Sequence, residues 1–373
     1  MKIVIAPDSY KGSLSSIDAA NIMNRAVTEV GGHHGIIKPM ADGGEGTVES
    51  LLASSKGERV PIRCTGPLGE QIDTYYAILD DTTAVMECAN IAGLVQVPEE
   101  SRNPDLTTSY GLGEVIIAAI ARGCTSIIIG LGGSATNDGG LGMLQALGMK
   151  SWDQADRETG PFGIDLLSLE KVSLTNLESK LSNVKLRIAC DVDNPLCGAQ
   201  GASAIYGPQK GATPEQISLY DKALDNFSNL VEKEIGRVDK EVPGAGAAGG
   251  LGFALLTLGA KLESGAKLMA DAMNLEEAIK ESDLVITGEG QSDEQTLFGK
   301  APSFVASIAN KYNVPTILIS GSLGSNSDEL RKVFAGCFSI IDKPQSLQVC
   351  IDQAEQLLYQ KTKHIIHFVN AIK

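Results

Sequence analysis

Residues 283–302 read Asp283-Leu-Val-Ile-Thr-Gly-Glu-Gly-Gln-Ser-Asp-Glu-Gln-Thr-Leu-Phe-Gly-Lys-Ala-Pro302. The apolar run at its start predicts a buried parallel strand. Glycines, acids, a lysine and a proline then follow within one loop. Open α/β sheets bind ligands at the carboxyl ends of their strands, where carboxylates hold Mg²⁺ and lysines meet phosphate. The stretch therefore predicts an α/β fold with a ligand site at this sheet edge.

The same rhythm of strand, loop and helix occurs at both ends of the chain. Two apolar runs near the start, 2–6 and 35–40, each lead into a polar loop. Later runs at 284–287, 316–320 and 338–341 alternate with helical patterns at 301–311 and 327–335. Five such strands fit a flavodoxin-like sheet of order 2-1-3-4-5. Because strands one and three are neighbours in that order, we expect the loop Asp8–Ser13 to lie beside the loop Gly288–Lys300.

The middle of the chain has a different pattern. Residues 59–64 and 73–79 alternate like antiparallel strands, and further strands are expected at 83–88, 126–129 and 185–189. A long polar helix is expected over 213–235, and a glycine-rich run at 244–250 opens a predicted helix from Phe253 to Leu262. We expect a discontinuous flavodoxin-like α/β domain over 1–57 plus 284–373. A second α/β domain would be inserted over 58–283, with the active site in the cleft between them.

Composition narrows the class of protein. The 373 residues include 46 acids and 31 basic residues, for a formal net charge of −15. A nucleic-acid binder is expected to carry the opposite sign. Seven scattered cysteines, no leader pattern and no apolar run of membrane-spanning length favour a cytoplasmic protein without a membrane or nucleic-acid partner. We expect small-molecule ligands and a monomer or homodimer.

A second strong motif is Gly130-Leu-Gly-Gly-Ser-Ala-Thr-Asn-Asp-Gly-Gly140, between a predicted strand and a helix. Glycine lets a backbone approach an anion, and the amides of a helix start point at it. An ordinary glycine turn in which Asp138 caps the helix is the alternative. The run also matches the dinucleotide pattern Gly-x-Gly-x-x-Ala, but its acidic partner about 20 residues later is not convincing.

Three other loops carry candidate residues. Lys11 and Ser13 suit an anionic group and Asp8 a hydroxyl, unless this loop is only salt-bridged and helix-capping. Asp42, in Asp42-Gly-Gly-Glu-Gly46, is either a site residue or part of a tight acidic turn. Asp191 ends another strand and is either a general base or a turn residue before a proline. Acids, lysines and a glycine loop, without a histidine base or cysteine nucleophile, fit phosphoryl transfer.

Together the motifs resemble the bacterial type I glycerate kinase family. The resemblance covers six collinear segments: Ala6–Leu14, Met40–Thr47, Thr65–Gly69, Gly130–Gly140, Cys190–Leu196 and Thr287–Pro302. It implies a two-domain α/β fold and ATP- and Mg²⁺-dependent phosphorylation of D-glycerate. The 2-hydroxyl is the usual acceptor, giving 2-phosphoglycerate, and the 3-hydroxyl is the alternative.

The resemblance and the residue chemistry together assign roles. Asp191 is the expected carboxylate that accepts or orients the proton of the substrate hydroxyl. Lys11, with Ser13, would hold the glycerate carboxylate or a transferring phosphate, and the cation of Lys300 would neutralise charge in the transition state. The remaining residues fall into three groups: Asp8, Ser13, Asp42 and Asn194 for the substrate; Gly132, Gly133, Ser134, Thr136 and Asn137 for the ATP phosphates; Asp42, Glu289 and Asp293 for Mg²⁺. An NAD(P)-dependent hydroxy-acid oxidoreductase and a non-catalytic nucleotide or sugar-phosphate sensor are the rival functions.

Overall fold

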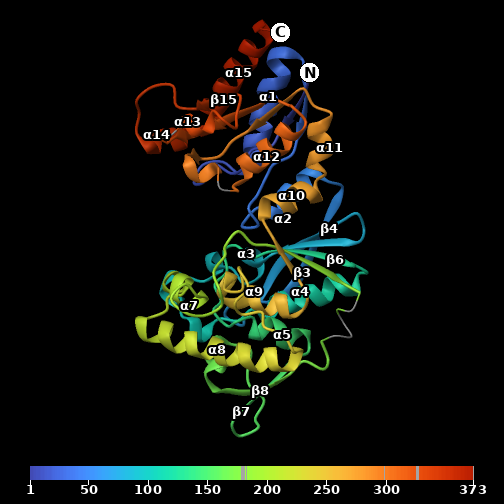
Figure 1. The fold of residues 1–373 in the computed structure, drawn as a ribbon, viewed down its shortest axis with the longest axis vertical. Coiled ribbons are helices and arrows are strands. Elements are labelled where there is room, and N and C mark those ends of the chain that lie inside the picture. The colour runs from blue at the N-terminus through green and yellow to red at the C-terminus, as the bar shows by residue number, and fades with distance from the viewer. Residues whose placement is uncertain (178–180, 182, 298, 325–326, 373) are drawn as a thin grey trace. The chain divides into compact units, whose positions relative to one another are not determined.

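The computed structural model describes residues 1–177, 181, 183–297, 299–324 and 327–372. Contacts within the chain divide it into two compact units (Figure 1). Unit 1 is Met1–Asp42, Glu49–Ser55 and Ser264–Lys373, and unit 2 is Gly43–Val48 and Lys56–Glu263. Residues 264–283 therefore group with unit 1, whereas we expected them in the inserted domain. They form α10 (Gly265–Ala272) and α11 (Leu275–Lys280), which contact each other and α12 (Ala301–Lys311).

Unit 1 contains a five-stranded sheet in which every neighbouring pair is parallel. Its strands are β1 (Lys2–Ile5), β2 (His34–Ile37), β11 (Leu284–Thr287), β13 (Thr316–Ser320) and β15 (Gly336–Ser339). Their spatial order is β2-β1-β11-β13-β15, which confirms the predicted order 2-1-3-4-5. A two-stranded pair, β12 (Gln291–Ser292) and β14 (Ser322–Leu323), follows β11 and β13.

Helices cover this sheet because its strands alternate their apolar side chains between two faces. On one face, α1 (Ser16–Gly31) packs against α15 (Ala354–Ile372), so the two ends of the chain lie side by side in Figure 1. On the other face, Leu318 packs with Ala306 of α12 and Leu330 of α13 (Ser327–Leu330). The predicted last helix from Ser346 to Phe368 is instead two helices, α14 (Leu347–Asp352) and α15.

Unit 2 contains a mixed six-stranded sheet of order β10-β9-β6-β5-β4-β3. β3 (Gly57–Thr65), β4 (Gln71–Leu79) and β5 (Thr83–Glu87) pair antiparallel, as predicted. β6 (Ser126–Gly130), β9 (Lys185–Ala189) and β10 (Lys261–Glu263) complete it in parallel with β5. The predicted helix to Leu262 is wrong at its end, because residues 261–263 pair with β9. A hairpin of β7 (Lys150–Asp153) and β8 (Leu169–Ser173) was not predicted.

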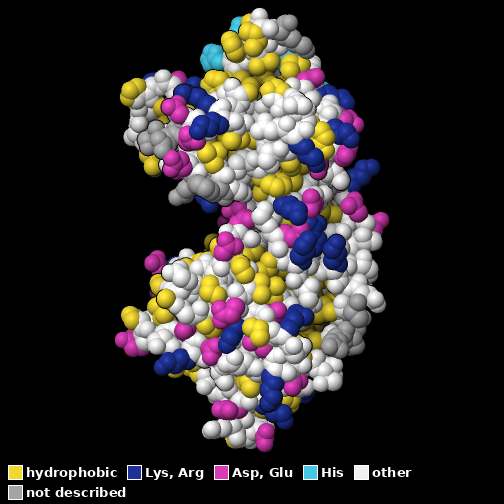
Figure 2. Space-filling model, in the orientation of Figure 1, with side chains coloured by type: hydrophobic (Ala, Val, Ile, Leu, Met, Phe, Trp, Pro, Cys, Tyr) yellow, Lys and Arg dark blue, Asp and Glu magenta, His cyan; other side chains and the backbone are white. Residues whose placement is uncertain are grey.

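The helices of unit 2 surround one continuous apolar core. They are α3 (Cys88–Ile91), α4 (Tyr110–Ala121), α5 (Leu141–Leu147), α7 (Ala202–Tyr206), α8 (Pro214–Ile235) and α9 (Ala247–Thr257), while α2 (Thr47–Ser54) spans a boundary between the units. On the face drawn in Figure 2, acidic side chains lie interspersed with lysines and arginines. Within the described part of the chain, every helix is too short or too polar to span a bilayer.

Candidate active site

The loops that follow β1 and β11 lie side by side in unit 1. The amide of Asp8 donates to the carbonyl of Gly288 at 2.8 Å. The buried Tyr10 hydroxyl reaches the carbonyl of Ile319, on the next strand β13, at 2.5 Å. The predicted neighbourhood of the Asp8–Ser13 and Gly288–Lys300 loops is therefore confirmed, except that Phe298 lies outside the described residues. Three strand ends thus bring their polar side chains to one edge of the sheet.

Asp8 has an unusual electrostatic environment. Burial raises its carboxyl pKa to about 7, and the neighbouring carboxylates of Asp42 and Glu289 add to the increase. The Ser9 amide, which donates to Asp8 at 2.6 Å, and the Lys11 cation act in the opposite direction. A carboxyl with this pKa is shared between its protonated and ionised forms near neutral pH. It can both donate to and accept from a substrate hydroxyl.

Glu289 is buried and hydrogen-bonded within its own loop. Its Oε1 accepts from the hydroxyls of Thr296 at 2.6 Å and Ser292 at 2.9 Å. Its Oε2 lies 3.9 Å from the ammonium of Lys300. The structure therefore brings together two residues predicted for the site. The supporting hydroxyls were missed, because their role depends on a loop conformation that residue type alone does not specify.

The other predicted residues of unit 1 lie in less enclosed positions. Lys11, Ser13 and Asp42 are exposed, and Asp293 is half-buried. The Ser13 hydroxyl donates to the carbonyl of Tyr10 at 2.9 Å and so closes the turn that carries Lys11.

The carboxylates predicted to hold Mg²⁺ are those of Asp42, Glu289 and Asp293. Among the described residues, no three His, Cys, Asp or Glu side chains lie close enough to hold a metal ion together. Mg²⁺ keeps several waters and usually takes only one or two protein carboxylates together with substrate phosphates. Asp42 and Glu289 both raise the pKa of Asp8 by repulsion, which a divalent cation would relieve. The donor set is therefore compatible with Mg²⁺ shared with a phosphate ligand, but not with a closed protein site.

In unit 2, the loop Gly130–Gly140 packs closely on the segment Gly43–Val48. A Cβ on Gly130 would lie 2.4 Å from the carbonyl oxygen of Gly43, and one on Gly132 2.5 Å from the Cα of Gly44. The amide of Gly132 also donates to that Gly43 carbonyl at 3.3 Å. The Glu87 carboxylate holds this segment by accepting hydrogen bonds from the backbone amides of Gly46 and Val48. Close backbone packing therefore explains two glycines of the dinucleotide-like pattern.

The centre of this loop is polar and buried. Ser134 is 6% exposed, and Thr136 and Asn137 are fully buried. The side-chain Nδ2 of Asn137 donates to the Ser203 hydroxyl at 3.0 Å. Thr136 Oγ1 and Asn137 Oδ1, in contrast, have no hydrogen-bond partner among the residues that the structure describes. A buried polar atom without a partner costs about 1–3 kcal/mol, which a bound ligand can recover. This is the feature of unit 2 that best fits a nucleotide phosphate site.

Asp138, in contrast, points into the protein. Its carboxylate accepts from the Ser109 hydroxyl at 2.6 Å and from the amides of Gly140 and Gly142 at 3.1 and 3.3 Å. Burial nevertheless raises the pKa of this carboxyl. These contacts make Asp138 the cap at the start of α5, as one interpretation of the sequence predicted for this residue.

Sequence reasoning missed Lys210 beneath this loop. Lys210 ends a short 3₁₀ helix (Pro208–Lys210) and is 2% exposed. Its ammonium donates to the Thr136 carbonyl at 2.6 Å and to the Ser134 hydroxyl at 3.0 Å. Burial lowers its pKa to about 8. Its segment, Pro208-Gln-Lys-Gly211, carries no recognised motif that could have identified it.

The third predicted loop of the site follows β9. Asp191 is exposed at the end of this strand. The side chain of Asn194 is engaged at both ends, donating to the Gln200 carbonyl at 2.8 Å and accepting from the Tyr206 hydroxyl at 2.6 Å. Asn194 thus braces the loop that presents Asp191.

The glycine-rich run 244–250 joins the last two loops. A Cβ on Gly246 would lie 2.2 Å from the carbonyl oxygen of Pro195, and one on Gly249 2.0 Å from that of Thr136. The run therefore packs against both the Asp191 loop and the Thr136 loop. Gly244, Gly246 and Gly249 also match the pattern Gly-x-Gly-x-x-Gly, and close packing, rather than a ligand, accounts for this match.

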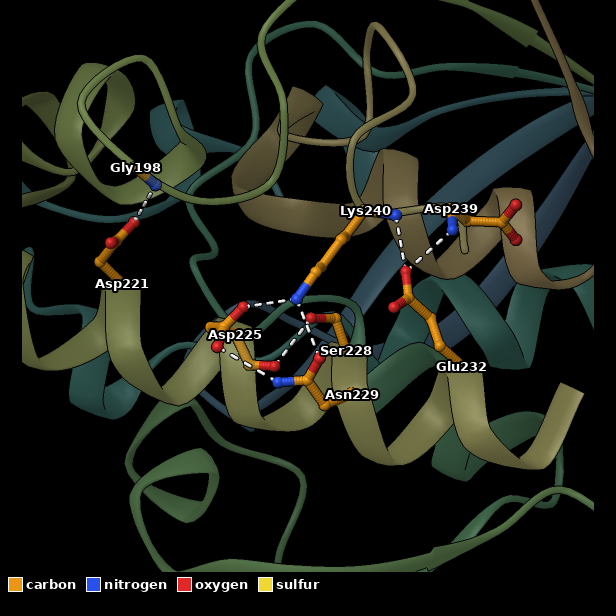
Figure 3. Close-up of polar contacts among 8 residues, drawn as sticks. All are labelled: Gly198, Asp221, Asp225, Ser228, Asn229, Glu232, Asp239 and Lys240. Atoms are coloured by element: carbon orange, nitrogen blue, oxygen red, sulfur yellow. Dashed lines mark hydrogen bonds and ion pairs between the residues drawn. The ribbon is translucent and has the colours of Figure 1, made fainter. Parts of the chain in front are cut away.

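Helix α8 makes several hydrogen bonds to Asp239 and Lys240, which follow it in the chain (Figure 3). Glu232 of α8 accepts from the amides of Asp239 and Lys240, each at 2.8 Å, and the Lys240 ammonium binds Asp225 at 2.6 Å. The carbonyl of Lys240 in turn accepts from the amide of Leu196 at 3.0 Å. The chain that follows Asp191 is therefore anchored through residue 240 to a long helix.

Comparison with known proteins identifies the family of this chain. Residues 3–370 match the model of the glycerate kinase family. The chain belongs to the glycerate kinase family. It is 48% identical over 326 residues to a glycerate 2-kinase of Escherichia coli K12, covering 87% of this chain and 86% of that protein. It is also 43% identical to a glycerate kinase of Bacillus subtilis 168, and the match covers 100% of this chain and 99% of that protein.

A solved structure extends the agreement to the fold of this glycerate kinase family member. A crystal structure described as a glycerate kinase 2 from Salmonella typhimurium LT2 matches with a TM-score of 0.90 at 42% identity, covering 100% of this chain and 98% of that one. The resemblance inferred from the motifs is thereby confirmed, as is the α/β fold class.

Proposed function

We propose that this protein is a glycerate 2-kinase that transfers the γ-phosphoryl group of ATP to the 2-hydroxyl of D-glycerate. The products are 2-phospho-D-glycerate and ADP. Its family supports phosphorylation of glycerate, and the 48% identity to a protein named glycerate 2-kinase favours the 2-hydroxyl over the 3-hydroxyl.

ATP phosphates would be held by the loop from Gly132 to Asn137. The buried hydroxyl of Thr136, which has no partner in the protein, supports this assignment. Mg²⁺ would be held by Asp42, Glu289 and Asp293 through water. When bound, the ion would neutralise charge on the phosphate oxygens.

Glycerate would be held by the loops of unit 1. The cation of Lys11 would bind the carboxylate of glycerate. Ser13, in the turn that carries Lys11, and Asp42, in the loop after β2, are also exposed. Asp8 would orient a glycerate hydroxyl, for which its pKa of about 7 is suited because it donates or accepts as required. Asn194 would act indirectly, by bracing the Asp191 loop.

In the reaction, Asp191 would accept the proton of the 2-hydroxyl as that oxygen forms a bond to the γ-phosphorus. The bond from the γ-phosphorus to the bridging oxygen of ADP breaks at the same time. Charge develops on the transferring group and on the leaving ADP oxygen, and Lys300 would balance part of it. This chemistry requires alignment and charge neutralisation and no covalent enzyme intermediate.

A coupled assay of ADP release with D-glycerate, ATP and Mg²⁺ tests the function, and phosphorus NMR of the product distinguishes the two hydroxyls. The Asp191→Asn variant should lose turnover by about 10²- to 10⁴-fold, since it cannot accept a proton. The exposed Asp193, two residues along the same loop, provides a matched control as Asp193→Asn. Near-normal turnover of Asp191→Asn would reject Asp191 as the base.

The same experiments separate the rival functions. An oxidoreductase would change nicotinamide absorbance with a hydroxy acid and release no ADP. A sensor would bind ATP without turnover. Size-exclusion chromatography with light scattering tests the expected monomer or homodimer.

A further inference from the structure

Lys210 is buried without a salt bridge among the described residues, which is rare for a lysine. Its two hydrogen bonds both go to the loop proposed to hold the ATP phosphates. Two titratable groups lie close enough to affect the pKa of Lys210: the carboxyl of Asp138, from the same loop, and the thiol of Cys88 in α3. Burial raises the pKa of Cys88 to about 12, so this thiol stays neutral at physiological pH.

These contacts fix the direction of two hydrogen-bond donors. An ammonium group only donates, so Ser134 Oγ must accept from Lys210 and its own proton must point elsewhere. The Thr136 carbonyl also points at Lys210. In a trans peptide the N–H lies opposite the carbonyl, so the amide of Asn137 points away from the lysine. The Ser134 hydroxyl proton and the Asn137 backbone N–H are therefore both directed away from the Lys210 ammonium.

A second observation indicates that this loop is completed by a ligand. Thr136 Oγ1, between those two donors in sequence, is buried and has no partner. A hydroxyl and a backbone amide that both donate away from a cation can bind the oxygens of a phosphate group, and the nearby cation favours its negative charge. A lysine that only supported the loop would require neither the orphaned hydroxyl nor the outward donors.

We propose that Lys210 is a positioning residue for nucleotide binding: it orients the donors of Ser134 and Asn137 toward an ATP phosphate and places a buried positive charge behind them. This inference rests on the proposed kinase function, and it names a residue that acts through the loop rather than by touching the substrate. Phosphate binding opposes loss of the lysine proton, so the charge is linked to nucleotide affinity.

Isothermal titration calorimetry with ATP and Mg²⁺, without glycerate, tests the proposal. Lys210→Met should weaken ATP binding about 10- to 100-fold, as expected for loss of a charged hydrogen-bond network, and leave the KM for D-glycerate unchanged. Because Lys210 acts through Ser134, the double variant with Ser134→Ala should lose less than the product of the two single effects. Lys150→Met, an exposed lysine of β7, is the matched control and should bind ATP normally.

A pH series on the unmodified protein gives a readout that does not depend on folding of a variant. Since Lys210 has a pKa of about 8 without ligand, the affinity of the protein for ATP should fall as the pH rises above that value. Lys210→Met should lack this fall. A flat profile in the unmodified protein, or normal ATP affinity in a Lys210→Met variant of lowered stability, would overturn the proposal. Failure of the unmodified protein to bind ATP would instead reject the proposed function.

Discussion

Replacing Asp8 with asparagine should stabilise unit 1 while reducing activity. Burial and two neighbouring carboxylates raise the Asp8 pKa from 3.8 to about 7. At about 1.4 kcal/mol per pKa unit, keeping Asp8 ionised costs the folded state at most about 4 kcal/mol. An asparagine carries no charge and can still accept from the Ser9 amide. Allowing for partial solvent access and relaxation, we expect a gain of about 1–3 kcal/mol in the free energy of unfolding above neutral pH.

The effect must depend on pH, with a sign set by the raised pKa. Below pH 3.8, Asp8 is protonated in both the folded and the unfolded protein, so it imposes no penalty. As the pH rises toward about 7, the unfolded state ionises first and gains stability relative to the folded state. The advantage of Asp8→Asn should therefore grow through this window and level off above it.

Urea unfolding at about pH 5 and about pH 8, in buffer without Mg²⁺, measures the change in the free energy of unfolding. Circular dichroism is the suitable signal, because the single tryptophan, Trp152, lies in unit 2 and does not report on unit 1. Asp352→Asn is the control: this exposed carboxylate of α14 accepts one bond from Gln348, which an amide retains. An equal effect of Asp8→Asn at both pH values would refute the electrostatic reasoning.

Variants at three further positions test the packing and hydrogen bonding of unit 2. Gly132→Ala places a Cβ 2.5 Å from the Cα of Gly44 and should cost about 1–3 kcal/mol by overpacking, with weaker ATP binding in calorimetry. Ala248 has a left-handed backbone conformation with φ 53°. Ala248→Gly should therefore leave the free energy of unfolding within about 1 kcal/mol of the original, because glycine adopts this conformation without strain. Ala248→Val should lower the free energy of unfolding clearly in the same urea titration. Glu232→Ala leaves two backbone amides without their acceptor and should cost about 2–4 kcal/mol, while Glu232→Gln keeps the acceptor and should lose less than half of that; equal losses would contradict this explanation.

The sheet of unit 1 could be predicted because its information is local. Each strand is a short apolar run between polar loops, and β11 and β13 have the predicted limits. β10 could not be predicted in this way. Its three residues, Lys261–Glu263, are too few to show a period, and their extended form depends on pairing with β9, some 70 residues earlier in the chain.

The candidate site shows the same division between local and distant information. Asp8 and Glu289 were identified because they follow strand ends, where parallel sheets gather polar side chains. Lys210 was not, because its partner Ser134 is 76 residues away and nothing in the neighbouring sequence refers to it. The hydroxyl of Thr296 belongs to the same class, since only the folded loop aims it at Glu289.

The glycines show why a motif can be read correctly for the wrong reason. A glycine is required wherever another group comes too close for a Cβ, whether that group is a bound phosphate or a neighbouring stretch of backbone. In the loop after β6, Gly132 meets the backbone of Gly44, and in the first turn of α9, Gly249 meets that of Thr136. The polar centre of the first loop is therefore the stronger evidence for a phosphate: the Thr136 hydroxyl has no partner among the described residues, and the Thr136 carbonyl is bound by a buried lysine. Close packing at its glycines gives that centre a rigid frame, so the two interpretations of the motif are complementary rather than exclusive.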